Sequence, residues 1–88
     1  MAVTVRVTIM LKRGVADPEG ENTKKALQLL GFKQVQHVRS MKTFQLTLEP
    51  AKGREDDDSV KREVEEMCRK LLANPVIHDY AIDLVSRE

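Results

Sequence analysis

The first dozen residues alternate between apolar and polar side chains. The odd positions carry the apolar set, which is Val3, Val5, Val7, Ile9 and Leu11. A period of two residues places alternate side chains on opposite faces of a β-strand. β-branched residues favour that conformation. The pattern therefore predicts a half-buried strand over 3–11, which ends before Gly14.

A first helix is predicted after this strand. Asp17 can accept a hydrogen bond from a free backbone N–H of the first turn, and Pro18 suits the first helical position. Ala26, Leu27 and Leu30 form its apolar stripe. Gly31 suits the left-handed residue that follows a helix, so the helix is expected to end at Leu30.

The second predicted helix has the stronger periodicity. Its apolar residues follow the i, i+4, i+7, i+8 spacing and are Val60, Val64, Met67, Cys68, Leu71 and Leu72. Asp57, Asp58 or Ser59 can cap its start, and acidic side chains there favour the positive end of the helix dipole. Asn74 and Pro75 end it.

Three further strands complete the predicted order. Residues 35–39 and 43–48 form two of them, and the short link Ser40-Met41-Lys42 predicts a hairpin, although it lacks the Gly or Asn of the tightest turns. The last strand begins near Val76 and alternates through Leu84. The order β-α-β-β-α-β is typical of an α+β fold with one antiparallel sheet and two helices on one face, the ferredoxin-like arrangement. We expect one such domain over residues 1–88.

The sheet face without helices is expected to mix polar and apolar side chains. It would carry Thr4, Arg6, Thr8, Met10, Gln45 and Thr47. Such a face can be solvated, or it can pack on a second copy. An exposed last strand offers another route to self-association, by strand pairing across a two-fold axis. The sequence does not choose between the two routes.

Composition excludes several classes of function. Fifteen Lys and Arg against 14 Asp and Glu give a net charge of +1, which argues against general nucleic-acid binding. Aromatic residues are only 3% and Trp is absent, which argues against a base-stacking platform. No apolar run approaches the roughly 20 residues that span a bilayer. A single cysteine allows no internal disulfide and, with no signal-peptide pattern at the N-terminus, favours a cytoplasmic protein.

The residue types needed for catalysis do not form a recognisable group. Cys68 lies on the apolar stripe of the second helix, where free cysteine usually packs as a small hydrophobe. His37 and His78 lack paired metal-ligand spacing. Residues 14–20 follow a strand and precede a helix, as in a phosphate cradle, but their acidic residues favour a helix cap. The acidic run at 55–58 is typical of a solvated loop. We therefore expect no catalytic, cofactor-binding or metal-binding residue in this chain.

Several blocks of sequence, taken in order, resemble one family. They are 17–20 (DPEG), 26–32 (ALQLLGF), 35–39 (VQHVR), 67–77 (MCRKLLANPVI) and the pair Asp79-Tyr80. Together they are similar to the PurS family, the small subunit of phosphoribosylformylglycinamidine synthase. The resemblance extends from Val3 to about Leu84. It implies a PurS-like variant of the ferredoxin-like fold.

The resemblance also implies a function. In the PurS family, formylglycinamide ribonucleotide, glutamine and ATP give formylglycinamidine ribonucleotide, glutamate, ADP and phosphate, in the fourth step of de novo purine synthesis. A large synthetase subunit uses ATP and Mg, and a glutaminase subunit releases ammonia. PurS-like proteins oligomerise and bridge these two partners, with no catalytic residue of their own. The partners implied here are a second copy, the synthetase subunit and the glutaminase subunit.

Two segments are our candidates for contact with partners. They contain Arg39, Ser40, Met41 and Lys42 in one and Val76, Ile77, His78, Asp79 and Tyr80 in the other. Ser40-Met41 departs from the glycine that PurS-like sequences commonly have after Val38-Arg39, and His78 stands at an often acidic position. These departures leave the contacts made there open.

Two other classes compete with this interpretation. A small-molecule-sensing regulatory domain can have the same β-α-β-β-α-β order, because fold alone does not define function. An RNA-binding module of this topology needs aromatic residues on its central strands, and residues 3–11 contain none.

Overall fold

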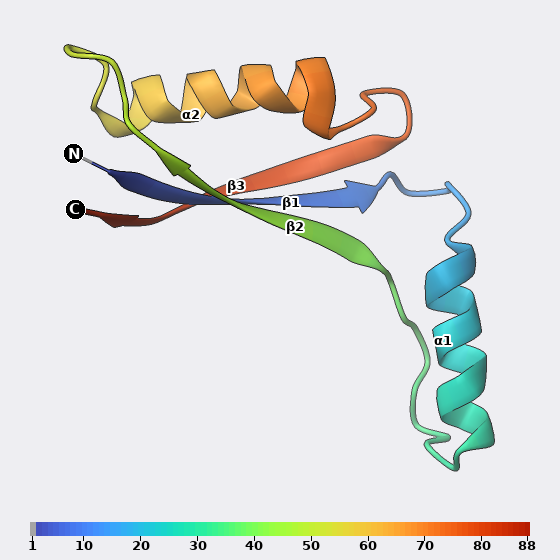
Figure 1. The fold of residues 1–88 in the computed structure, drawn as a ribbon. Coiled ribbons are helices and arrows are strands. Elements are labelled where there is room, and N and C mark those ends of the chain that lie inside the picture. Colours follow the sequence, from blue (N-terminus) through green and yellow to red (C-terminus); the bar gives the residue numbers. More distant parts are fainter. Residues whose placement is uncertain (1) are drawn as a thin grey trace.

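A single central strand organises the molecule, for which a computed structural model describes residues 2–88. The elements are β1 (Val3–Leu11), α1 (Pro18–Leu29), β2 (Met41–Leu48), α2 (Asp57–Met67), the π-helical turn η1 (Cys68–Leu72) and β3 (His78–Arg87). β1 lies between β2 and β3 and is antiparallel to both (Figure 1). Val7 pairs with Phe44 on one side and Ile82 on the other. This register aligns the apolar positions of all three strands on one face.

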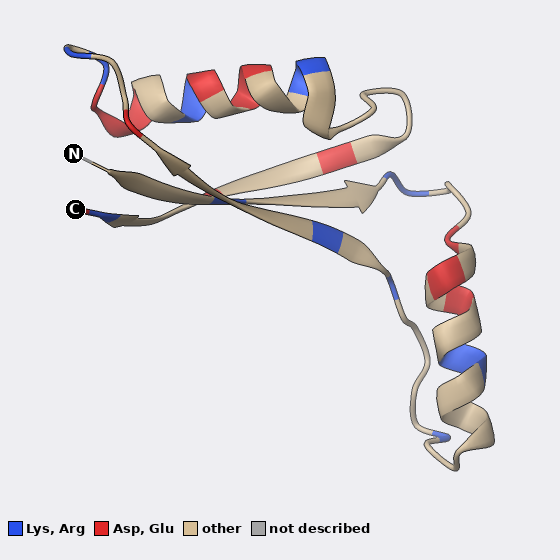
Figure 2. Ribbon diagram, in the orientation of Figure 1, with Lys and Arg blue, Asp and Glu red and all other residues tan. Residues whose placement is uncertain are grey.

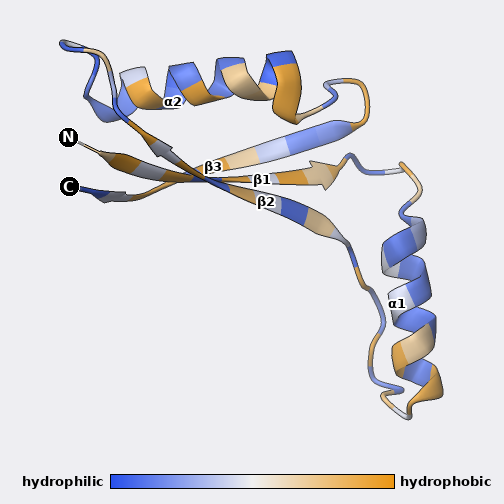
Figure 3. Ribbon diagram, in the orientation of Figure 1, coloured by the Kyte–Doolittle hydropathy of each residue, from blue (hydrophilic) through white to orange (hydrophobic). Residues whose placement is uncertain are grey.

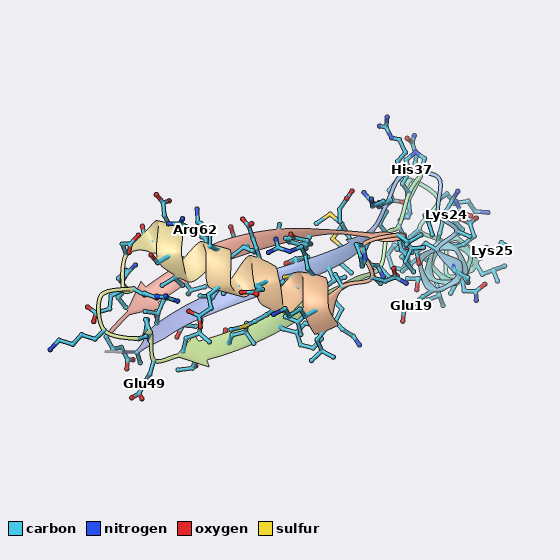
Figure 4. The ribbon with its side chains drawn as sticks, turned by 90° about the horizontal axis from the view of Figure 1, so that it is seen from above. Glu19, Lys24, Lys25, His37, Glu49 and Arg62 are labelled. Carbon is cyan, nitrogen blue, oxygen red and sulfur yellow. The ribbon has the colours of Figure 1, made fainter. Side chains whose placement is uncertain are left out.

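The core lies between that face and α2. Figure 4 shows α2 running along the sheet, and Figure 1 places it on one side only. The buried hydrophobic residues that form it are Val3, Val5, Val7, Ile9, Val60, Val64, Cys68 and Ala73. Phe44, Leu46, Ile82 and Leu84 pack against them from the flanking strands. The alternation predicted for residues 3–11 is thereby confirmed, as is the burial of Cys68.

The predicted α+β, ferredoxin-like class is confirmed, but the predicted strand at 35–39 is wrong. Residues 35–40 carry no regular secondary structure and return alongside α1, where the Gln28 side-chain amide donates to the Val35 carbonyl at 3.0 Å. Val35 and Val38 do not alternate as an amphipathic strand requires. The sheet therefore has three strands among the described residues. The predicted hairpin at Ser40–Lys42 is also wrong, because β2 already begins at Met41.

The two helices differ in what they cover. Only α2 packs on the sheet, whereas α1 projects from one end of it (Figure 1). Asp17 caps α1 as predicted, accepting from the Gly20 amide at 2.9 Å, and Gly31 takes the predicted left-handed conformation with φ 104°. The helix ends at Leu29, one residue before the expected end.

The ends of α2 differ in detail from the prediction. Asp56 caps it, accepting from the Ser59 amide at 3.1 Å, so the predicted caps at 57–59 lie inside the first turn. At the other end the Ala73 amide donates to the Cys68 carbonyl at 2.9 Å, which closes a wider π turn. The wider turn changes which residues share a face. Leu71, predicted on the apolar stripe, is 84% exposed.

The second face of the sheet is open and carries polar side chains together with the paired Met10 and Met41, the mixed character that was expected. Arg6 donates to Gln45 at 3.3 Å, and the Thr8 and Thr43 hydroxyls lie 3.2 Å apart. These cross-strand pairs contribute modestly to sheet stability. Within residues 2–88, no helix has the length and apolar character needed to cross a membrane.

The core is small and lies between the sheet and the single helix α2, so truncation of one of its valines should destabilise the fold. We expect Val64→Ala to lower the free energy of unfolding by about 2 kcal/mol, because it removes two buried methyl groups and leaves a cavity. Val76→Ala removes the same atoms from a side chain that is 78% exposed, and we expect a change near zero. Urea unfolding measures both. Equal effects would contradict the assignment of the core.

Candidate docking site at the elbow

α1 is joined to the sheet by a cluster of polar contacts that we call the elbow, formed by Asp17, Gly20, Arg39 and Ser40. The Asp17 carboxylate accepts hydrogen bonds from the Ser40 amide and the Ser40 hydroxyl, both at 2.7 Å, and from the Gly20 amide. One side chain therefore ties the start of α1 to the residue before β2. Arg39 adds a bond to the end of β1, donating to the Leu11 carbonyl at 2.6 Å.

These contacts act on the charge of Asp17. The Ser40 hydroxyl, then the Ser40 and Gly20 amides, and more weakly the Arg39 guanidinium, stabilise the carboxylate and hold the pKa of Asp17 below its ordinary value of 3.8. The elbow is therefore held by charged hydrogen bonds at neutral pH, and such bonds are stronger than neutral ones.

The elbow also requires a residue without a side chain at position 20. Gly20 is buried, and a Cβ built there would lie 2.5 Å from the Val38 carbonyl oxygen and 2.6 Å from an Asp17 carboxylate oxygen. Real Cβ atoms do not approach backbone oxygen so closely. Glycine is therefore required at position 20 because two backbone segments approach each other closely there.

A groove of about 930 Å³ opens beside the elbow. Its lining is mostly apolar and consists of Ile9, Leu11, Glu19, Ser40, Met41, Lys42, Thr43, Phe44, Leu71, Leu72 and His78. Lys42 places its ammonium 5.7 Å from the centre of the Phe44 ring. An open, apolar groove with a few polar groups at its margin suits contact with another protein surface.

β1 brings the two predicted contact segments to the same end of the sheet. Met10 pairs with Met41 on one side and with Asp79 on the other. Ser40, Met41, Lys42 and His78 line the groove, whereas Arg39 is engaged by β1. A role for these nine residues in partner contact stays a prediction.

The second segment is a turn fixed by its own side chains. His78 accepts the Asn74 amide through Nδ1 at 2.9 Å, and the Asn74 side chain accepts the Val76 amide at 2.9 Å. The Ile77 carbonyl accepts the Lys12 amide at 2.8 Å, which joins the turn to the chain just after β1. Val76 is 78% exposed at its tip. Asp79 and Tyr80 lie in β3 on opposite faces of the sheet.

Sequence reasoning found part of this site. It identified Asp17 as a helix cap, but the contact with Ser40 joins residues 23 positions apart and carries no local signal. The apolar spacing predicts Leu71 and Leu72 on the core stripe; Leu72 does pack against the core, whereas Leu71 is exposed. Their place in the groove depends on the π turn, which the spacing of apolar residues does not show.

The reactive side chains do not gather at the groove. Cys68 is buried, and desolvation, followed by the nearby Glu65 charge, raises the pKa of its thiol. Among the residues that the structure describes, no three His, Cys, Asp or Glu side chains are grouped to hold a metal ion.

The fold and the groove define a small α+β protein of the ferredoxin-like class, with a surface suited to assembly. The family model of PurS, phosphoribosylformylglycinamidine (FGAM) synthase, matches residues 4–86. The PurS subunit of FGAM synthase from Archaeoglobus fulgidus is 58% identical over 76 residues, which cover 86% of this chain and 90% of that protein. The Bacillus subtilis subunit is 42% identical over 80 residues, 91% of this chain and 89% of that protein.

Solved structures agree with the sequence comparison. The crystal structure of Methanocaldococcus jannaschii PurS, one of the subunits of formylglycinamide ribonucleotide amidotransferase, matches with a TM-score of 0.86 and 46% identity over the whole of both chains. A chain of PurLQS from Thermotoga maritima, at 24% identity and a TM-score of 0.84, shares the fold over 97% of this chain and 99% of its own. The chain belongs to the PurS family. It is a subunit of FGAM synthase, a ligase of purine biosynthesis.

The close approach at Gly20 gives a first test of the elbow. We expect Gly20→Ala to lower the melting temperature by several degrees, because the new methyl group would push apart Val38 and the Asp17 carboxylate. Asn22→Ala, at an exposed position of the same helix, should leave it unchanged or slightly raise it. Equal melting temperatures for the two variants would contradict the packing described here.

The charge of Asp17 gives a second test. Because its pKa is lowered in the folded state, its contribution to stability is present above pH 3.8 and is lost as the pH falls through the lowered value. Ser40→Ala removes the largest cause, so the Asp17 titration midpoint should rise toward 3.8. Carboxyl-carbon NMR follows both proteins, with Asp56, whose carboxylate accepts from Ser59 at the start of α2, as the internal control. An unchanged Asp17 midpoint would show that Ser40 does not hold this carboxylate.

Proposed function

We propose that this chain is the non-catalytic connector of FGAM synthase, which joins the synthetase and glutaminase subunits and supports ammonia transfer between them. The observation that carries the proposal is an apolar groove at the elbow, on a chain whose cysteine is buried and whose histidines lie apart on 35–40 and on β3. Such a chain contributes a shaped surface. The catalytic groups, ATP and Mg belong to the larger subunits.

The reaction gives a reason for such a connector. The synthetase transfers the terminal phosphoryl group of ATP to the amide oxygen of the substrate, ammonia adds to the amide carbon, and phosphate leaves. Ammonia released into water at neutral pH is largely protonated and is then not a nucleophile. A closed path between the site that releases ammonia and the site that uses it keeps the free base available. A subunit that holds the two sites together preserves that path.

Relatives support these partners. The Methanocaldococcus jannaschii protein is one subunit of an amidotransferase. The Thermotoga maritima neighbour comes from PurLQS. For this chain we infer three partners: a second copy, the large synthetase subunit and the glutaminase subunit. Residues 1–88 act as one domain in the cytoplasm, where this pathway operates.

A reconstituted assay tests the proposal. The purified synthetase and glutaminase subunits are supplied with substrate and ATP, with and without this chain, and FGAM is measured with either glutamine or an ammonium salt as the nitrogen source. We expect omission to reduce the glutamine-dependent rate at least tenfold and to leave the ammonium-dependent rate within about twofold, because the chain couples two sites and takes no part in the synthetase chemistry.

Groove variants provide the control. Met41→Glu introduces a charge into the apolar groove, whereas Val85→Glu introduces the same charge at the far end of β3. We expect Met41→Glu to reproduce the omission and Val85→Glu to behave as the unaltered chain. A glutamine-dependent rate that is the same with and without the chain would refute the connector role.

A further inference from the structure

An imidazole ring closes the turn between η1 and β3. Residues 74–78 form this turn, which we call the His78 turn. The Nδ1 atom of His78 accepts the Asn74 amide at 2.9 Å, which joins the chain just after η1 to the first residue of β3. The Asn74 side chain accepts the Val76 amide at 2.9 Å, and its carbonyl accepts the Ile77 and His78 amides at 3.1 and 2.8 Å. The amides of the turn are therefore satisfied within it, and the Asn74 amide depends on the ring.

This contact defines the protonation state of His78. A ring nitrogen that accepts a hydrogen bond carries no proton, so the imidazole is neutral in the closed turn and its hydrogen is on Nε2. A proton taken up at Nδ1 turns the acceptor into a donor, and two N–H groups then face each other. The Asn74 amide loses its partner. Histidine ordinarily changes charge around pH 6.5, so the contact should be lost between neutral and mildly acidic solution.

The segment around the turn contains no other charge. Residues 71–78 include no Lys, Arg, Asp or Glu. Figure 2 shows the connection from η1 to β3 without charged residues, and Figure 3 shows it to be apolar just before the hydrophilic start of β3. His78 is thus the side chain of this segment that changes charge near neutral pH.

Charged and titratable groups surround the ring from the neighbouring elements. They are Glu19 of α1, Lys42 of β2, Asp79 and Tyr80 of β3, and Lys12 and Arg39 at the end of β1. η1 contributes the uncharged Leu71 and Leu72. Both signs of charge are present, so the hydrogen bond to Asn74 is the contact that distinguishes the two forms of the ring.

The His78 turn forms one side of the elbow groove. His78, Leu71 and Leu72 all line it. The Ile77 carbonyl accepts the Lys12 amide at 2.8 Å, which holds the turn to the chain just after β1. Release of the Asn74 amide therefore loosens the side of the groove formed by η1 and the turn. The other side, formed by the paired strands β1 and β2, keeps its ladder of hydrogen bonds.

We propose that His78 is a pH-responsive clasp for this side of the groove: the neutral ring holds the His78 turn closed, and protonation opens it. The closed form prevails above the pH range in which the ring takes up its proton, and the open form prevails below it. The structural part of the proposal depends on the contacts of the turn alone. Its effect on activity rests on the connector role proposed above, because that role uses the groove.

Nitrogen-15 NMR of the full chain tests the clasp. At about pH 8 we expect a coupling through the hydrogen bond between the Asn74 amide nitrogen and His78 Nδ1, with the ring hydrogen on Nε2. At about pH 5 the coupling should be absent, and exchange of the Asn74 amide, corrected for its intrinsic pH dependence, should be about tenfold faster. His37, exposed between α1 and β2, is the internal control. A coupling that is absent at the higher pH, or that persists once both rings are protonated, overturns the proposal.

Two variants separate the acceptor from the charge. In His78→Asn, Oδ1 lies the same number of bonds from the backbone as Nδ1 of histidine and does not titrate, so the Asn74 amide should stay protected at both pH values. His78→Leu lacks an acceptor, and this amide should exchange rapidly at both. Circular dichroism confirms that the variants are folded, and the titration of the unaltered chain decides the proposal if they are not. The same pH dependence in His78→Asn as in the unaltered chain contradicts the clasp.

The reconstituted assay measures the effect on function. Between about pH 7.5 and 6, the ratio of glutamine-dependent to ammonium-dependent FGAM formation should fall about threefold more with the unaltered chain than with His78→Asn. The partner subunits are the same in both mixtures, so their own pH dependence cancels. If NMR shows the clasp opening but the two ratios change alike, the clasp is confirmed and the result counts against the groove as the connecting surface. If omission of the chain has no effect, the connector role alone is refuted.

Discussion

Burial of β1 is the constraint on which the rest of the molecule depends. Val3, Val5 and Val7 are fully buried because β1 has a strand on each side and α2 above it. Its hydrogen-bonding groups are directed into the two ladders, and one set of its side chains enters the core. A residue in β1 therefore affects both flanking strands together. Truncation of a valine there or in α2 acts on the only core among the described residues.

Because α2 alone covers the core, α1 does not pack on the sheet. In a ferredoxin-like sheet both helices usually share the covered face, but here α1 leaves the sheet at the elbow. Its direction then depends on a few polar contacts, chiefly those of Asp17, and not on packing of its apolar side chains. This division lets the chain present an exposed helix without unfolding its core. It also explains why Leu29, the most exposed of the large apolar residues, lies on α1, whose weak apolar stripe does not pack on the core.

The fold could be read from the sequence where the signal was local. Alternation over 3–11 and the helical spacing from Val60 to Cys68 both reported burial correctly, because each residue there meets one continuous core. The prediction of a strand over 35–39 was wrong because Val35 and Val38 are three residues apart. That spacing is as compatible with irregular backbone as with a strand. The predicted burial of Leu71 was wrong because the backbone hydrogen bonding changes from α-helical to π-helical at Cys68–Leu72. The elbow could not be found in advance, since Asp17 and Ser40 meet only after β1 and β2 have paired.

The serine at position 40 is explained by the elbow. A glycine, which the resemblance to PurS-like sequences implies at this point, would still offer its backbone amide to Asp17, because that bond needs no side chain. Serine keeps this bond at 2.7 Å and adds a second from its hydroxyl, also at 2.7 Å. The departure therefore leaves the path of the chain unchanged and strengthens the contact that orients α1. Through these contacts Ser40 acts on the direction of the helix that leaves the sheet at the elbow.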